Sequence, residues 1–454
     1  MDGDVKKDGG AAGIHRHDGA PRGATRHDGL DRRAVVRALA GGVAGLAAFA
    51  GRAFAQGSPG QDAVLEQLIQ QSQGRNFGQG FDSASRTILM PKASLPTLDP
   101  STAQTSEQFI PRYEEIVARG GWPTVPQVER LRLGNRNPAV PVLRDRLAVS
   151  GDIDPAAAGA GDVYDSYVEA AVRRFQARHG LTVDGVVRQQ TLKALNVPAQ
   201  VRLAQLRINV VRLRTLSSNL GNKLVVANIP AAQIEAIEGG VVVSRHVTVA
   251  GKPDRASPIL QSRVVEVNFN PYWTVPVSIV RKDLIPRMQE EPDYLTKNHI
   301  RIFDGRGTEL QPTQINWNSN EAVNYRFKQD PGDFNSLGSI RINFPNKDDV
   351  YMHDTPSKSL FGEDFRFHSS GCMRVQNVRD LVVWLLSDTP GWSRAEIDAV
   401  IKSGERKDAR LATPVPLYWV YVTAWVTPDG VVQFRDDIYS RDGLAASQGA
   451  ASRG

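Results

Sequence analysis

The chemistry that this sequence can perform centres on its one cysteine, Cys372, and on His353, nineteen residues earlier. The reactive form of a cysteine is the thiolate, and a nearby imidazole commonly takes up the thiol proton. Gly371 stands directly before the cysteine, and a glycine lets backbone N–H groups approach a developing oxyanion. These residues predict nucleophilic acyl transfer, with imidazole and thiol about 3 Å apart. We also expect His353 to raise the thiolate fraction at neutral pH, because a free thiol has a pKa of about 8.5.

Two other interpretations of the same residues stay open. A lone cysteine is often a small buried hydrophobic residue, and a histidine on a strand is often held by hydrogen bonds alone. In a zinc site, His353, His368 and Cys372 would supply three ligands. Asp354 would supply the fourth. The sequence lacks a close pair of ligands with the usual zinc spacing, which disfavours the metal, and we read His368 as a supporting or exposed residue.

The pattern of apolar residues over 222–445 predicts a strand-rich domain, which would position Cys372 and His353. Apolar and polar residues alternate around Val265, Val267 and Phe269, as in a half-buried strand. A helical piece is expected near Lys282 to His299. A further helix is predicted by the i, i+3, i+4, i+7 spacing of Val378, Leu381, Val382 and Leu385.

The preceding residues predict a small helical module over 126–197, between two scaffold segments. The clearest helical spacing in the module is that of Val168, Ala171, Val172 and Phe175. The scaffold segment over 198–221 continues with apolar residues at helical spacing, and the segment over 87–125 is also expected to be helical. The sequence over 151–162 is a low-complexity loop of Asp, Ala and Gly.

The first 55 residues are typical of an export signal. Arg32 and Arg33 precede a short apolar stretch over 38–50, and Ala53-Phe54-Ala55 provides an A-x-A cleavage site. The arginine pair and the weak apolar stretch indicate a twin-arginine signal. Thirteen helical residues extend only about 20 Å, too short for a membrane anchor. Residues 56–86 are expected to form a mobile tail after cleavage, and residues 446–454 a second tail.

The composition excludes several other classes of protein. The chain has 454 residues, of which 41% are hydrophobic and 23% charged, so it can bury a core and is not disordered throughout. It contains no run of eighteen apolar residues, which excludes a protein with several membrane spans. The net charge is +6, and half of this excess lies in residues 1–55. Nucleic acid is therefore not an expected partner.

The last 190 residues resemble the catalytic domain of L,D-transpeptidases, the YkuD-type fold, and are most similar to its large periplasmic branch typified by YcbB. The resemblance covers Val267–Asp442. The run Ala171–Val197 resembles the three-helix peptidoglycan-binding module of wall enzymes. The implied fold class is α+β. The segments that match the catalytic domain are Asn270–Pro276, Gln329–Gly332, Asn335–Gly338, Phe344–Asn346, His353–Pro356, Ser370–Val375 and Asp436–Tyr439.

The resemblance also implies roles for individual residues. Cys372 would be the nucleophile and His353 the base. The amides of Gly371 and Cys372 would form an oxyanion hole. Side chains that would shape the substrate site are those of Ser370, Arg374 and Tyr351. Many family members have histidine where this chain has Ser370. One possible hydrogen-bond donor is therefore missing here, and His353 and the backbone would have to do more of the catalysis. The insert over 282–325 resembles the mobile lid of this branch, with a packing insert as the alternative.

The implied function is that of a murein L,D-transpeptidase in the periplasm or cell envelope. It would form 3→3 crosslinks between a tetrapeptide donor and a diamino-acid acceptor, and carbapenems would inhibit it. Acyl transfer to an amine implies no cofactor and no metal. Other wall-synthesis proteins could be partners. Alternatives are an L,D-carboxypeptidase, a lipoprotein-attaching transpeptidase and a non-catalytic wall-binding scaffold. A papain-like or NlpC-like peptidase is disfavoured, because its cysteine precedes its histidine in the chain.

Overall fold

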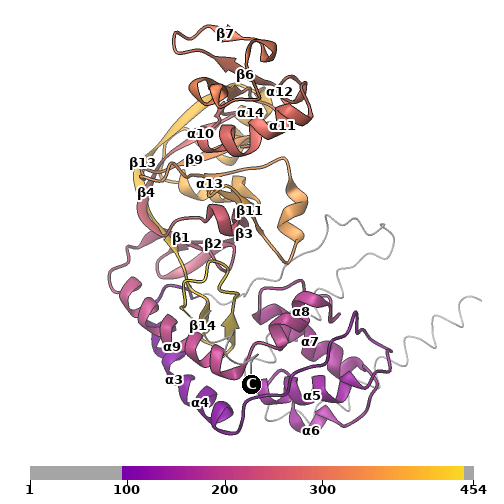
Figure 1. Ribbon diagram of the computed structural model, residues 1–454. Coiled ribbons are helices and arrows are strands. Elements are labelled where there is room, and N and C mark those ends of the chain that lie inside the picture. Colours follow the sequence, from indigo (N-terminus) through magenta and orange to yellow (C-terminus); the bar gives the residue numbers. More distant parts are fainter. Residues whose placement is uncertain (1–94, 444–454) are drawn as a thin grey trace, which may run out of the picture. The chain divides into compact units, whose positions relative to one another are not determined.

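The computed structural model describes residues 95–443 (Figure 1). All of these residues belong to one compact unit. The export signal and the two tails, over 56–86 and 446–454, therefore lie outside the described residues and stay predictions. No helix within the described range is long and apolar enough to cross a membrane.

Helices precede and follow the predicted module along the chain. They are α3 (Pro100–Gln108), α4 (Ile110–Ala118) and α9 (Ala199–Leu216). Asp99 caps α3 by accepting the Ser101 N–H at 2.8 Å. Leu206 and Leu213 of α9 are fully buried, which confirms the helix predicted after residue 198. The hairpin of β14 (Ala424–Val426) and β15 (Val432–Phe434) packs against these helices.

The module predicted over 126–197 is helical and has its own apolar core. Asp165 caps its clearest helix by accepting the Val168 N–H at 3.0 Å. All four apolar positions that predicted this helix are fully buried, which confirms it. Arg178, at its end, binds both carboxylate oxygens of Asp152 at 2.6 Å. The helices of the module are α5 (Ala139–Ser150), α6 (Pro155–Ala158), α7 (Ser166–Arg178) and α8 (Gln189–Leu195).

The domain after residue 222 is built on a nine-stranded sheet in the order β11-β3-β12-β10-β9-β4-β13-β1-β2. Because β3 also pairs with β2, the strands from β3 round to β2 close into a ring. The predicted strand-rich α+β fold is confirmed. The strands of this sheet are β1 (Lys223–Asn228), β2 (Gln233–Glu238), β3 (Val241–Gly251), β4 (Leu260–Phe269), β9 (Ile340–Asn343), β10 (Met352–His353), β11 (Phe367–Ser369), β12 (Met373–Val375) and β13 (Lys407–Val420).

The insert between β4 and β9 has its own core and its own sheet, in the order β5-β8-β6-β7. The helical piece expected near 282–299 is confirmed as far as Lys297, but the helical lid insert implied over 282–325 needs correction, since strands follow the helices. Ile300 and Ile302 are buried on either side of exposed Arg301, and this period of two builds a strand. The elements of the insert are β5 (Trp273–Thr274), α10 (Val277–Ile279), a π-helical turn (Val280–Leu284), α11 (Ile285–Glu290), α12 (Tyr294–Lys297), β6 (Ile300–Phe303), β7 (Glu309–Leu310) and β8 (Arg326–Gln329).

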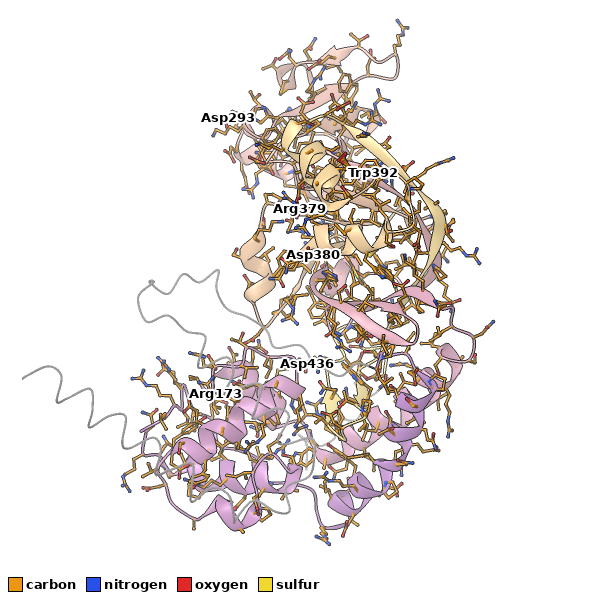
Figure 2. The ribbon with its side chains drawn as sticks, turned by 180° about the vertical axis from the view of Figure 1, so that it is seen from behind. Arg173, Asp293, Arg379, Asp380, Trp392 and Asp436 are labelled. Atoms are coloured by element: carbon orange, nitrogen blue, oxygen red, sulfur yellow. The ribbon has the colours of Figure 1, made fainter. Side chains whose placement is uncertain are left out.

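The main core lies between one face of the large sheet and the helices α13 (Val378–Leu385) and α14 (Arg394–Ser403). The helix predicted from Val378 to Leu385 is confirmed, because all four of its apolar positions are buried. Figure 2 labels Arg379 and Asp380, the exposed residues of α13 that form ion pairs with α14. One face of this helix thus packs on the sheet while its charged side links to the next helix.

A β-bulge corrects the alternation predicted for β4. The register of β4 with β13 shifts between the pairs that involve Val264 and Glu266. As a result Val264 is buried in the core and Val265 is only half-buried. Val267 and Phe269 are fully buried, as predicted. The sheet therefore keeps an apolar core face, and polar residues of the same strands occupy the opposite face.

Candidate active site

The candidate site lies on three neighbouring strands of the large sheet. Strand β10 pairs in parallel with β12, which sets His353 beside Arg374, and antiparallel with β9, which sets His353 beside Arg341. Side chains alternate between the two faces of a strand. These three side chains therefore share the face opposite to fully buried Met352 and Met373. One arginine stands on each side of the imidazole.

His353 is buried, and its imidazole is neutral. Its Nδ1–H donates to the backbone carbonyl of Asp354. Because a carbonyl oxygen can only accept, this contact keeps the proton on Nδ1 and leaves the lone pair of Nε2 free. Burial, followed by the charges of Arg374 and Arg341, lowers the pKa of His353 to about 3, against an opposing effect of Asp354. The imidazole is therefore available as a base at neutral pH.

Asp354 anchors the end of β10. Its carboxylate accepts the N–H of Ser339 at 3.2 Å and the hydroxyl of Ser339 at 3.1 Å, and it pairs with Lys358. Gly338 has a φ of +57°, and a Cβ at this position would lie 2.5 Å from a carboxylate oxygen of Asp354. The close approach thus requires glycine. The residue whose carbonyl orients His353 is consequently fixed by Lys358 and by the residues directly before β9.

A tight turn between β11 and β12 presents Cys372. Gly371 has a φ of +118°, a conformation that favours glycine. The Ser369 hydroxyl accepts the Gly371 N–H at 3.2 Å and donates to the Cys372 carbonyl at 2.6 Å. The Gly371 amide thus donates within the turn in this structure, and its place in an oxyanion hole stays a prediction. The Cys372 N–H makes no hydrogen bond within residues 95–443.

A second set of hydrogen bonds supports this turn. The Ser257 hydroxyl donates to the Gly371 carbonyl at 2.7 Å and accepts the Gly251 N–H at 2.9 Å. The Tyr439 hydroxyl donates to the Gly251 carbonyl and accepts the Ser257 N–H at 3.2 Å. The segment after β15 therefore helps to fix the backbone that carries Cys372. Sequence reasoning assigned no role to Ser257.

The thiol of Cys372 is half-buried and un-ionised at neutral pH. Burial raises the pKa of Cys372 to about 11, against opposing effects of hydrogen bonds from Tyr351 and the charges of Arg341 and Arg374. His353 is not among the groups that lower the pKa of Cys372 here, and the expectation that it raises the thiolate fraction stays a prediction. No direct hydrogen bond joins the thiol and the imidazole among the described residues. The parallel register explains this, since Tyr351 rather than His353 lies level with Cys372.

Tyr351 connects the thiol to its surroundings. The indole N–H of Trp273 donates to the Tyr351 hydroxyl at 3.1 Å, and the guanidinium carbon of Arg341 lies 4.3 Å from the centre of the Tyr351 ring. The rings of Tyr351 and His353 are 5.6 Å apart. Burial and then the negative charge of an ionised Cys372 raise the pKa of Tyr351. Tyr351 thus keeps its proton and can donate it in a hydrogen bond to the sulfur.

Ser370 is exposed beside the cysteine turn and connects it with the insert. Its hydroxyl accepts a hydrogen bond from Arg255 at 3.0 Å. Arg255 also pairs with both carboxylate oxygens of Asp283, in the π-helical turn of the insert. Trp273, in β5, makes a second contact between the insert segment and the site. The structure therefore brings Ser370, Arg374 and Tyr351 to the surroundings of Cys372.

The ligands considered for zinc do not gather. No group of three or more His, Cys, Asp or Glu side chains is arranged to hold a metal ion within residues 95–443. The exposed ring of His368 instead lies 2.9 Å from both the Glu363 carboxylate and the Phe365 carbonyl. This agrees with the interpretation of His368 as a supporting or exposed residue.

Besides Ser257, the site contains Arg341 and Trp273, to which the sequence analysis assigned no role. The sequence does contain a signal for Arg341, because the alternation of Ile340, Arg341 and Ile342 predicts that the arginine lies opposite to the core. It does not say which strand is the neighbour, so it could not place Arg341 beside His353.

Comparison with known proteins identifies the class of domain. Residues 222–398 match the sequence profile of the YkuD family, described as "L,D-transpeptidase catalytic domain", and this span includes His353 and Cys372. Residues 136–195 match the profile described as "Putative peptidoglycan binding domain". The chain thus carries a YkuD-type catalytic domain and a peptidoglycan-binding domain, and the resemblance recognised in the sequence is confirmed.

Individual relatives agree with these domains. A curated protein of Haemophilus influenzae, named "Putative L,D-transpeptidase", is 32% identical over 239 residues, which are 52% of this chain and 48% of the relative. The chain therefore spans about half the length of the curated relative that it matches.

Two of the similar solved structures are described as L,D-transpeptidases. One from Mycobacterium smegmatis is 15% identical, with 43% of this chain and 58% of that chain covered and a TM-score of 0.22. One from Xylanimonas cellulosilytica is 17% identical, with 64% of this chain and 99% of that chain covered and a TM-score of 0.21.

Proposed function

We propose that this protein is a murein L,D-transpeptidase that forms 3→3 crosslinks through an acyl-enzyme on Cys372. The observation that supports this most strongly is the placement of Cys372. A fixed turn presents the thiol on the sheet face that also carries His353, an imidazole whose Nε2 lone pair is free. The donor would be a tetrapeptide stem, attacked at the carbonyl on the L-centre of its third residue, a diamino acid.

Acylation would start from a neutral thiol and a neutral imidazole. As the sulfur forms a bond to the carbonyl carbon, the thiol proton passes to Nε2 of His353. This transfer requires the two side chains to approach when substrate binds, and catalytic hydrogen bonds commonly tighten at that stage. The Tyr351 hydroxyl donates to the sulfur as it gains negative charge. The free Cys372 N–H is placed to donate to the oxyanion.

The tetrahedral intermediate then breaks down, and His353 gives up the proton that it took from the thiol. The bond to the terminal D-alanine breaks, His353 protonates the departing amine, and a thioester remains on Cys372. An amine of a neighbouring stem attacks the thioester, and His353 accepts its proton. The carbon–sulfur bond breaks as the sulfur takes that proton back. Water as the acceptor would make the protein an L,D-carboxypeptidase, and a lipoprotein lysine would make it a lipoprotein-attaching enzyme.

The acyl-enzyme can be tested by intact-mass analysis of the protein with a disaccharide-tetrapeptide donor. The expected adduct equals the donor minus D-alanine, and muropeptide analysis after incubation with sacculi should show 3→3 crosslinks. Cys372→Ala should form no adduct, and His353→Ala should form it slowly. An adduct on Cys372→Ala would contradict the nucleophile. Sacculi left unchanged by the wild-type protein would instead favour a non-catalytic scaffold.

We also propose that the module within 126–197 binds peptidoglycan and takes no part in the chemistry. Its match to a peptidoglycan-binding profile supports this role. The proposed location is accordingly the periplasm or cell envelope, with export by a twin-arginine signal, and the proposed inhibitors are carbapenems that acylate Cys372. The insert would act as a lid, supported by its contacts to Ser370 through Arg255 and to Tyr351 through Trp273.

A further inference from the structure

Arg341 and Arg374 carry positive charges that no carboxylate in the described part of the chain balances. Neither guanidinium forms a hydrogen bond or ion pair with another side chain within residues 95–443. The Nε atom of each is shielded from solvent without a hydrogen-bond partner. Arg341 contacts the face of the Tyr351 ring, which holds its side chain in place. The two arginines are therefore held beside the candidate base with donors unused.

The nearest acidic side chains on the neighbouring strands are occupied elsewhere. Asn268 is the cross-strand neighbour of Arg341, and its amide donates to Glu266 at 2.9 Å and to Asp408 at 2.7 Å. Neither carboxylate forms an ion pair with Arg341 or Arg374 among the described residues. Partly buried charges are normally paired. Two unpaired guanidinium groups on one sheet face therefore indicate that the partner is an anionic ligand.

The position of the arginines relative to the thiol identifies the anion. Arg374 lies two residues after Cys372, and such residues share a face about 6.6 Å apart along a strand. Arg341 lies two strands away from Arg374, about 9.6 Å between the backbones. In the donor stem, the carboxylate of the leaving residue lies roughly one residue length, about 3.5 Å, beyond the attacked carbonyl. A stem bound with its leaving residue towards Arg374 would bring this carboxylate to the two guanidinium groups.

We propose that Arg341 and Arg374 bind the free carboxylate of the D-amino acid that leaves the donor stem. This inference rests on the proposed function and adds a substrate requirement to it. The site selects stems that end in a free carboxylate directly after the attacked carbonyl. Stems extended by a further residue lose the contact, because their carboxylate lies one residue further away. Arg341 is the residue of this pair that the ring of Tyr351 holds in place, so its replacement tests the contact.

The requirement is tested by calorimetric binding in a Cys372→Ala background, where no acylation occurs. The ligands are a tetrapeptide stem with a C-terminal carboxylate and the same stem with a C-terminal carboxamide. The carboxylate should bind at least about tenfold more tightly, as expected for a charge-assisted contact. Arg341→Gln should reduce this preference to about threefold or less. Arg341→Lys should keep part of it, because it keeps the charge.

Arg410→Gln is the matched control. Arg410 is an exposed arginine on β13 of the same sheet and forms no ion pair among the described residues, so its replacement should leave the tenfold preference intact. Equal binding of the two stems to the Cys372→Ala protein would overturn the proposal. So would an Arg341→Gln protein that keeps the full preference. If the wild-type protein forms the acyl adduct but the carboxylate stem is not bound more tightly than the carboxamide stem, only the carboxylate site is rejected. If the carboxylate stem is bound more tightly but no adduct forms, only the proposed acyl transfer is rejected.

Discussion

Acidification should destabilise the sheet domain by forcing a proton onto the buried imidazole of His353. In the folded protein, burial and the neighbouring arginines hold the pKa of His353 at about 3. In the unfolded chain a histidine has a pKa near 6.5. Between these two values the unfolded state binds more protons, so the free energy of unfolding falls as the pH falls. The contribution of neutral His353 to the free energy of unfolding is fully present above about pH 6.5 and is lost progressively towards about pH 3.

The size of this effect follows from the difference between the two pKa values. A difference of about 3.5 units, at about 1.4 kcal/mol per unit, corresponds to roughly 5 kcal/mol over the whole range. Between pH 7 and pH 4.5 the loss is about 2.7 kcal/mol, a large part of a typical unfolding free energy of 5–15 kcal/mol. Burial also lowers the pKa of His246, so the wild-type protein alone does not isolate His353.

A comparison of variants separates the two histidines. Urea unfolding at pH 7 and pH 4.5 can be followed by tryptophan fluorescence, which reports on this domain because every tryptophan except Trp122 follows residue 222. Between the two pH values, His353→Gln should lose about 2–3 kcal/mol less than the wild type. His368→Gln, a change on an exposed side chain, should behave as the wild type does. Equal losses in His353→Gln and the wild type would refute the buried neutral imidazole.

Two further predictions concern the thiol and the module. Tyr351→Phe removes a hydroxyl that lowers the pKa of Cys372. Alkylation of the thiol by iodoacetamide at pH 8, measured by intact mass, should therefore slow by about tenfold. An unchanged rate would contradict the hydrogen bond from Tyr351 to the thiol. Deletion of residues 126–197 should weaken sacculus pull-down while the acyl-enzyme still forms with a small soluble donor; unchanged pull-down would make the module a spacer.

Local patterns were sufficient to predict several elements of the fold. The apolar spacing of Val168 to Phe175 predicted α7, and that of Val378 to Leu385 predicted α13, because a helix buries one stripe of its own sequence. The helical expectation for the insert failed after Lys297. There, short strands such as β6 form because they pair with β8, which is a non-local contact. Val265 was misplaced for a related reason, since a bulge depends on the partner strand.

The sequence by itself determined which residues could do chemistry. Cys372 has no other cysteine as a partner, Gly371 precedes it, and His353 stands in a short strand-like run. These are properties of single positions and their neighbours, so they can be read without knowledge of the fold. The family profiles then placed both residues inside one catalytic domain.

Only the tertiary structure decided how these groups interact. Strand register placed Tyr351 level with the thiol and an arginine on each side of the imidazole, and burial set the pKa values of Cys372 and His353. The folded turn also lets the Gly371 amide donate a hydrogen bond to the Ser369 hydroxyl. Register, burial and hydrogen-bond partners all depend on residues distant in the chain, such as Arg341, and are fixed only when the strands assemble.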